Sequence, residues 1–259
     1  MFRRWPLAGD PAIWLNSAMA ETRQTPAEGA DTRPPLVWDL PLRLFHWLLV
    51  IAIAGCWLTH ELGVEYMDWH MRLGYLALGL VIFRVFWGFA GPRYARFSDF
   101  VRGPGEVLDY AGRWLRGEAG ATAGHNPLGG WSVLALLAIV SVQAVSGLFN
   151  SDDILTSGPW RAAVPADFAD AMSWLHGFNF NVLLALVAMH IAAVLFYTLK
   201  LRAGLIGAML TGRKKIADAA AGIGGHRLAA AAALAALAGG LVWLLIAMAP
   251  APTTADFTF

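Results

Sequence analysis

Five long apolar stretches, separated by shorter polar segments, dominate the pattern of this chain. They span about residues 38–59, 70–90, 127–149, 174–198 and 228–249. Each reaches the roughly 20 residues that an α-helix needs to cross the hydrocarbon core of a bilayer. None shows the apolar–polar alternation of a membrane β-barrel strand. Because a membrane span must satisfy its own backbone hydrogen bonds, the pattern predicts an all-α integral membrane helix bundle.

The composition agrees with this interpretation. Of the 259 residues, 58% are hydrophobic and only 14% are charged, whereas soluble domains have about 45–50% and 25%. Cys56 is the single cysteine, which excludes an intrachain disulfide, a cysteine-ligated iron–sulfur cluster and a C-x-x-C-H site for covalent haem. The sequence shows no pattern of a nucleotide, flavin or nucleic-acid site, and we expect membrane lipid to be its main surroundings.

Charged residues alternate between the two ends of the predicted helices. Basic residues gather in the N-terminal arm and in the connections after the second and fourth apolar segments, whereas acidic residues follow the first and third. The positive-inside rule therefore predicts a bacterial inner-membrane protein with a cytoplasmic N-terminus and a periplasmic C-terminus. The basic residues of the two connections are Arg93, Arg96, Arg102, Arg113, Arg116, Lys200, Arg202, Arg213, Lys214, Lys215 and Arg227.

Histidines inside the apolar segments are the main chemical signal. His176 and His190 lie fourteen positions apart in one segment, which places them about 21 Å apart along a helix and on nearly the same face. His46, near the cytoplasmic end of the first segment, falls at the level of His190, which we call the inner level. His70, at the start of the second, falls at the level of His176, the outer level. An ionisable group at membrane depth is costly, so this arrangement indicates a function.

Two facing imidazoles can hold a haem iron from both sides, and the cores of helix bundles are common haem sites. The levels therefore predict one haem between His46 and His190 and another between His70 and His176. Two protein ligands leave the iron no open position, which suits electron transfer, and we assign no catalytic residue. A His-lined ion or metal transporter is the alternative, because histidine chains also form proton relays.

Three arginines near these histidines are candidate partners for haem propionates. Arg84 lies fourteen residues after His70 and therefore shares its face at the inner level. Arg43 precedes His46 by three residues, and Arg72 follows His70 by two. A guanidinium offers an anion a bidentate fork of donors. Arg43 and Arg72 are also consistent with snorkelling residues at the membrane surface, and Arg84 with a quinone contact.

The other polar residues are expected to be structural. His125 precedes Asn126-Pro127, which is typical of a helix N-cap followed by proline at the first helical position. We interpret His125 as solvated or structural. Gln143, Asn179 and Asn181 are expected to join helices by hydrogen bonds, and contact with a quinone is the alternative.

Several motifs resemble those of a known family. They are LRLFHW at 42–47, WHMRLGY at 69–75, GHNPLGGW at 124–131, and the histidine pair of the fourth segment. Over about residues 36–215 the chain is similar to the bacterial di-haem cytochrome b561 family, which includes the cytochrome b subunits of nickel–iron hydrogenases and superoxide oxidase. GHNPLGGW resembles the hydrogenase branch. The resemblance implies two non-covalent haems b, with His46, His70, His176 and His190 as axial ligands.

The resemblance also implies a function and partners. We expect electron transfer between a periplasmic donor, either a c-type cytochrome or a dehydrogenase subunit, and the quinone pool. A stand-alone superoxide:quinone oxidoreductase is an alternative, and a homodimer is compatible with the sequence. The expected parts are a disordered cytoplasmic arm over 1–36, a di-haem transmembrane domain over 37–215, and a linker with a fifth transmembrane helix over 216–259.

Overall fold

The computed structural model describes residues 34–118, 120, 122–151, 156–215 and 222–250. Within these ranges the regular structure is helical, and residues with strand geometry occur only in the isolated bridges Leu36–Arg213 and Ser151–Ser157. The predicted all-α class is therefore confirmed. The expected disordered arm falls almost wholly on residues outside these ranges.

Among the residues that the structure describes, five helices are long and apolar enough to cross a membrane. They are α2 (Leu40–Leu62), α3 (Met67–Ala90), α6 (Pro127–Gly147), α7 (Ala166–Leu199) and α9 (Leu228–Ala247). The number and places of the predicted spans are confirmed. The start of α7 differs, because the helix begins at Ala166, before the apolar stretch. Its 34 residues extend about 50 Å, so its first turns continue beyond the length of a bilayer core.

Shorter helices connect the long ones at the inner end of the bundle. They are α4 (Phe97–Phe100), α5 (Pro104–Leu115) and α8 (Leu205–Thr211), together with the 3-10 turn Arg93–Ala95, whereas the 3-10 turns Val64–Tyr66 and Arg161–Ala163 lie in the connections at the outer end. The chain that follows α8 returns to the start of α2, where the backbone N–H groups of Val37 and Trp38 donate to the carbonyl of Gly212 at 2.8 and 3.0 Å. The inner end is therefore closed by segments that are far apart in the sequence.

Side-chain caps fix where two of the spans begin. Asp39 accepts a hydrogen bond from the backbone N–H of Leu42 at 2.9 Å, at the start of α2. Asn126 accepts one from the N–H of Gly129 at 2.7 Å, with Pro127 at the first position of α6. The predicted cap at Asn126 is confirmed. Such caps satisfy N–H groups that the first helical turn leaves without partners.

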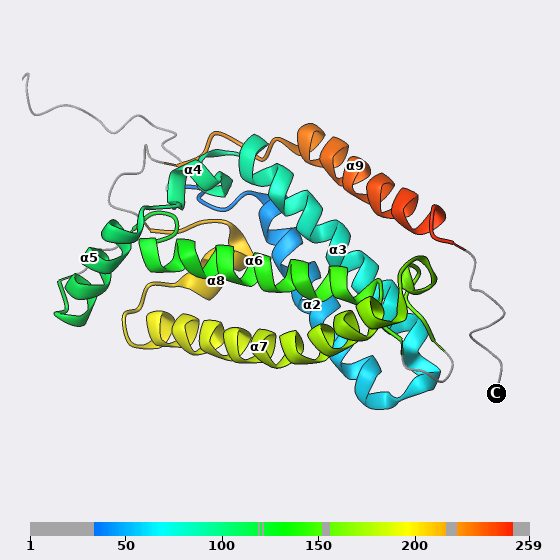
Figure 1. Ribbon diagram of the computed structural model, residues 1–259. Coiled ribbons are helices and arrows are strands. Elements are labelled where there is room, and N and C mark those ends of the chain that lie inside the picture. Colours follow the sequence, from blue (N-terminus) through cyan, green and yellow to red (C-terminus); the bar gives the residue numbers. More distant parts are fainter. Residues whose placement is uncertain (1–33, 119, 121, 152–155, 216–221, 251–259) are drawn as a thin grey trace, which may run out of the picture. The chain divides into compact units, whose positions relative to one another are not determined.

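The long helices pack as neighbours in a defined order. α2 packs on α3, α3 on α6, and α6 on α7, while α9 packs on α3, as Figure 1 shows. Trp160 and Arg227 tie α9 to the rest of the bundle, since the Trp160 indole donates to the carbonyl of Leu245 at 3.1 Å and Arg227 donates to that of Ala90 at 2.9 Å. Four helices therefore form the core, and α9 lies against one of them.

Polar contacts join the outer halves of α6 and α7. The side-chain amide of Asn179 donates to the side chain of Gln143 at 2.7 Å and to the carbonyl of Ile139 at 3.0 Å. Asn179 is buried. The predicted hydrogen bonding between helices is therefore confirmed for these two side chains, and it fixes the position of α7 close to His176. It is wrong for Asn181, which is exposed and donates to the carbonyl of Gly177 in its own helix at 3.0 Å.

Candidate haem sites

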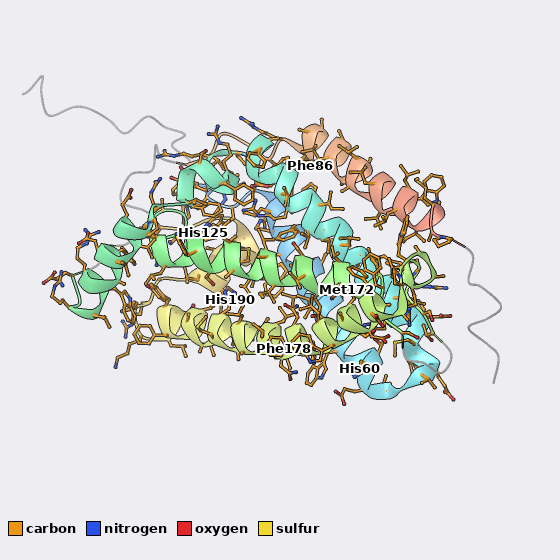
Figure 2. All side chains as sticks on the ribbon, viewed as in Figure 1. His60, Phe86, His125, Met172, Phe178 and His190 are labelled. Atoms are coloured by element: carbon orange, nitrogen blue, oxygen red, sulfur yellow. The ribbon has the colours of Figure 1, made fainter. Side chains whose placement is uncertain are left out.

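The structure brings the four histidines together in two pairs. The ring centroids of His46 on α2 and His190 on α7 lie 6.5 Å apart. Those of His70 on α3 and His176 on α7 lie 6.2 Å apart. α7 thus contributes one histidine to each pair, and the pairs are those that the helical levels predict. Figure 2 shows His190 toward one end of the bundle and His60 toward the other.

The separation of the rings fits an iron between two imidazoles. An imidazole nitrogen lies about 2.0–2.1 Å from a bound transition metal, and the ring centroid lies about 1.1 Å further out, so the two centroids should be about 6–6.5 Å apart. The distances of 6.5 and 6.2 Å agree with this value. Both pairs therefore have room for one six-coordinate iron.

Main-chain carbonyls orient both histidines of the outer pair. Nδ1 of His70 lies 2.9 Å from the carbonyl oxygen of Cys56, and Nδ1 of His176 lies 3.0 Å from that of Gln143. A carbonyl only accepts, so each Nδ1 carries the proton and donates it. The Nε2 atom of each ring keeps its lone pair, which is the arrangement that a metal ligand needs.

The inner pair has a different environment. Nδ1 of His46 is buried and has no hydrogen-bond partner within the described part of the chain. The edge of the His46 ring meets the Trp47 ring at a centroid distance of 5.0 Å. The His46 ring is therefore placed mainly by packing.

Arg84 is the most unusual polar residue of the bundle. Its side chain is 1% exposed, and its guanidinium carbon lies 4.9 Å from the ring centroid of Phe97 and 5.8 Å from that of Phe100. Neither terminal nitrogen has a hydrogen-bond partner among the described residues. The carboxylate of Asp39 is close enough to act on this charge. A buried cation with unused donors is suited to binding an anion.

The other two arginines of the sequence prediction differ from Arg84. Arg43 donates through Nη1 to the carbonyl of Leu210, and its buried Nε has no partner in the ranges that the structure describes. Arg72 is exposed and lies over the Trp69 ring at 5.2 Å. Arg43 therefore keeps a free donor at the inner level, whereas the position of Arg72 agrees with a snorkelling surface residue.

His125 is a residue whose position the sequence analysis missed. Its ring packs between Trp38 and Phe100, at centroid distances of 4.7 and 4.8 Å, and its Nδ1 is buried without a partner among the described residues. Burial and, to a smaller extent, the nearby charges of Arg84, Lys214 and His190 lower the pKa of His125 to about 3. His125 therefore lies at the inner level rather than in solvent. The motif GHNPLGGW was the available signal.

Comparison with known proteins identifies the family of this chain. Residues 37–212 match the family model described as prokaryotic cytochrome b561. The chain is 25% identical over 190 residues to a probable Ni/Fe-hydrogenase B-type cytochrome subunit of Azotobacter chroococcum, covering 61% of this chain and 79% of that protein. It is 23% identical over 226 residues to a protein of the same description from Cupriavidus necator, covering 74% and 91%. No solved structure gave a significant match. The chain therefore belongs to the prokaryotic cytochrome b561 family and is a multi-pass membrane cytochrome b of electron transfer.

Proposed function

We propose that this chain holds two non-covalent haems b, one between His46 and His190 and one between His70 and His176, and carries electrons from one face of the membrane to the other. The observation that carries the proposal is the spacing of the two pairs, 6.5 and 6.2 Å between ring centroids, at two levels of one bundle. Each spacing suits two axial imidazoles on one iron.

A haem whose iron has two protein ligands can carry one electron, and its iron has no open position for oxygen or substrate. The residues of the chain orient the ligands. The carbonyls of Cys56 and Gln143 accept from the Nδ1–H groups of His70 and His176, which would leave the Nε2 atoms of both rings free to bind an iron. Because these hydrogen bonds hold the two rings in place, we expect the positions of His70 and His176 to change little when the haem is oxidised or reduced.

The arginines are the proposed partners of the haem propionates. Arg84 supplies a buried cation for a propionate of the inner haem, and Arg43 has one further free donor at that level. Arg72 is placed for a propionate of the outer haem or for a lipid headgroup at the membrane surface. An arginine–carboxylate contact stabilises both charges when water is excluded.

The partners follow from the family and from the charge pattern. We propose that the electrons come from a periplasmic partner, which is either a c-type cytochrome or the catalytic subunit of a dehydrogenase, and pass to the quinone pool. The two relatives are described as cytochrome subunits of a hydrogenase, which favours a dehydrogenase of that kind. The basic connections support an inner level that faces the cytoplasm.

The test is to count and pair the haems. Purified protein should contain two acid-extractable haems b per chain with low-spin, six-coordinate spectra. His46→Ala and His190→Ala should each remove the same redox component, and His70→Ala and His176→Ala the other. The component that remains shows that each variant is folded, and His226, which lies before α9 and outside both pairs, provides the control variant His226→Ala. One haem per chain, or a loss of the same component in His46→Ala and His70→Ala, contradicts the proposal.

A further inference from the structure

We propose that Arg84 and His125 together form a carboxylate-binding site at the inner level, and that this site holds a propionate of the inner haem. The site presupposes the two-haem function proposed above. It assigns a binding role to the GHNPLGGW motif, residues 124–131, which the ligation of the irons does not use.

The segment that carries His125 is held firmly on both sides. Asn126 caps α6 through the N–H of Gly129 at 2.7 Å, and its amide donates to the hydroxyl of Tyr197 on α7 at 3.1 Å. Before His125, the ammonium group of Lys214 donates to the carbonyl of Thr122 at 2.7 Å. These bonds connect the motif to α7 and to the segment after α8, so they restrict where the His125 ring can lie.

The glycines of the motif allow it to pack closely against the connection that follows α3. A Cβ atom on Gly124 would lie 2.8 Å from a ring carbon of Tyr94. A Cβ atom on Gly130 would lie 2.6 Å from the backbone oxygen of Phe100. Larger residues at these two positions would push the motif away from Tyr94 and Phe100. The sequence of the motif is therefore suited to bringing His125 against the residues around Arg84.

Arg84 and His125 lie beside the same aromatic ring. The guanidinium carbon of Arg84 is 5.8 Å from the ring centroid of Phe100, and the His125 ring is 4.8 Å from it. Nη1 and Nη2 of Arg84 and Nδ1 of His125 are all buried, and none has a hydrogen-bond partner in the described ranges. Buried polar atoms in native proteins nearly always have partners. Three unused polar atoms around one ring therefore indicate a missing ligand.

The chemistry of the donors identifies the class of ligand. A guanidinium stays charged in proteins and presents a planar fork, which matches a carboxylate. An imidazole with a proton on Nδ1 adds one further donor. The electrostatic contact of His125 with His190 places this group of donors near an axial ligand of the inner pair. A neutral quinone carbonyl would leave the charge of Arg84 without a counter-ion.

Asp39 is the competing partner for Arg84 within the chain. Its Oδ1 already accepts from the Leu42 N–H and from the indole of Trp87, at 2.9 and 3.1 Å. Its Oδ2 has no partner in the described ranges. An ion pair between Asp39 and Arg84 would leave Nδ1 of His125 unsatisfied, whereas a carboxylate from the haem can receive both donors.

The experiment is a redox titration of the purified protein with haem content measured first. His125→Phe should lower the midpoint potential of the inner component, which the His46 and His190 variants identify, and leave the outer component unchanged. His125→Asn, whose amide can place a donor close to the position of Nδ1, should shift that potential less. Arg84→Gln should give the larger shift, because a charge is lost. His60→Phe, at a histidine toward the other end of the bundle from His190, is the control for the inner component.

Each outcome bears on the site. Loss of the inner haem in His125→Phe but not in His125→Asn also supports it. Two haems with an unchanged inner midpoint in His125→Phe overturn it, as do equal effects of Phe and Asn. A change confined to the KM for quinone, with both midpoints unchanged, also overturns it. Fewer than two haems in the parent protein would instead contradict the proposed function, so the two failures are distinguishable.

Discussion

Asp39 offers a direct test of how the inner end of the bundle is held together. The residue is fully buried, and one oxygen accepts both the capping hydrogen bond of α2 and the hydrogen bond from Trp87 on α3. Replacing Asp39 by Ala removes an N-cap, which costs about 1 kcal/mol. It also leaves the buried indole N–H of Trp87 without an acceptor, which costs about 1–3 kcal/mol. We expect the free energy of unfolding to fall by about 2–4 kcal/mol.

The assay is thermal unfolding in detergent, followed by tryptophan fluorescence and by loss of haem absorbance. For a chain of this size about 1 kcal/mol corresponds to 2–4 °C, so Asp39→Ala should unfold roughly 5–15 °C lower. Asp39→Asn keeps an acceptor oxygen and should cost much less, because burial raises the pKa of Asp39 and so disfavours its charged form. Trp87→Phe keeps the cap and serves as the second control.

Two results would refute this reasoning. If Asp39→Ala unfolds within 2 °C or so of the parent, by the same scale of about 2–4 °C per kcal/mol, the two hydrogen bonds do not hold α2 on α3. If Asp39→Asn is as unstable as Asp39→Ala, the charge of Asp39 is the main contribution, and an ion pair with Arg84 becomes the better account of that residue.

Three further predictions concern other positions. Folding raises the pKa of Asp39, so between the usual value of 3.8 and the raised value the folded state binds more protons than the unfolded state. The free energy of unfolding should therefore fall as pH rises through that window in the parent and not in Asp39→Asn, which unfolding measured at several pH values would show. Gly130→Ala should destabilise by about 1–3 kcal/mol in denaturant unfolding, since its Cβ would lie 2.6 Å from a backbone oxygen, whereas Gly105→Ala, where nothing lies within 4 Å, should be neutral or stabilising. Gly147→Ala would place a Cβ 3.0 Å from Cε1 of His176, so the spectrum of the outer haem should change while that of the inner one stays the same.

The helices and the histidine pairs could be predicted from the sequence because both depend on regular geometry. A continuous apolar stretch of sufficient length predicts a span whatever surrounds it. The rise of the helix then fixes the level of each histidine within the spans, so His46 falls at the depth of His190. The early start of α7 could not be predicted in this way, because Asp167 and Asp170 make its first turns polar while leaving them helical.

The environments of Arg84 and His125 could not be predicted, because they depend on segments that are distant in sequence. Trp38 and Phe100 bury the His125 ring from two separate parts of the chain. Asp39, which lies near Arg84, precedes the first span and is far from Arg84 along the chain. Local patterns show that a residue is polar, but they do not show which other segments exclude water from it.

α7 carries one histidine of each pair within a single uninterrupted helix, and this limits how the gene can change. One inserted or deleted residue between His176 and His190 would rotate one of them by about 100° relative to the other and move it by 1.5 Å along the axis. No adjustment of the remaining helix could then keep both rings in place. We therefore expect related genes to differ freely in length in the connections between helices, whereas the interval of fourteen positions should be the same in every functional copy.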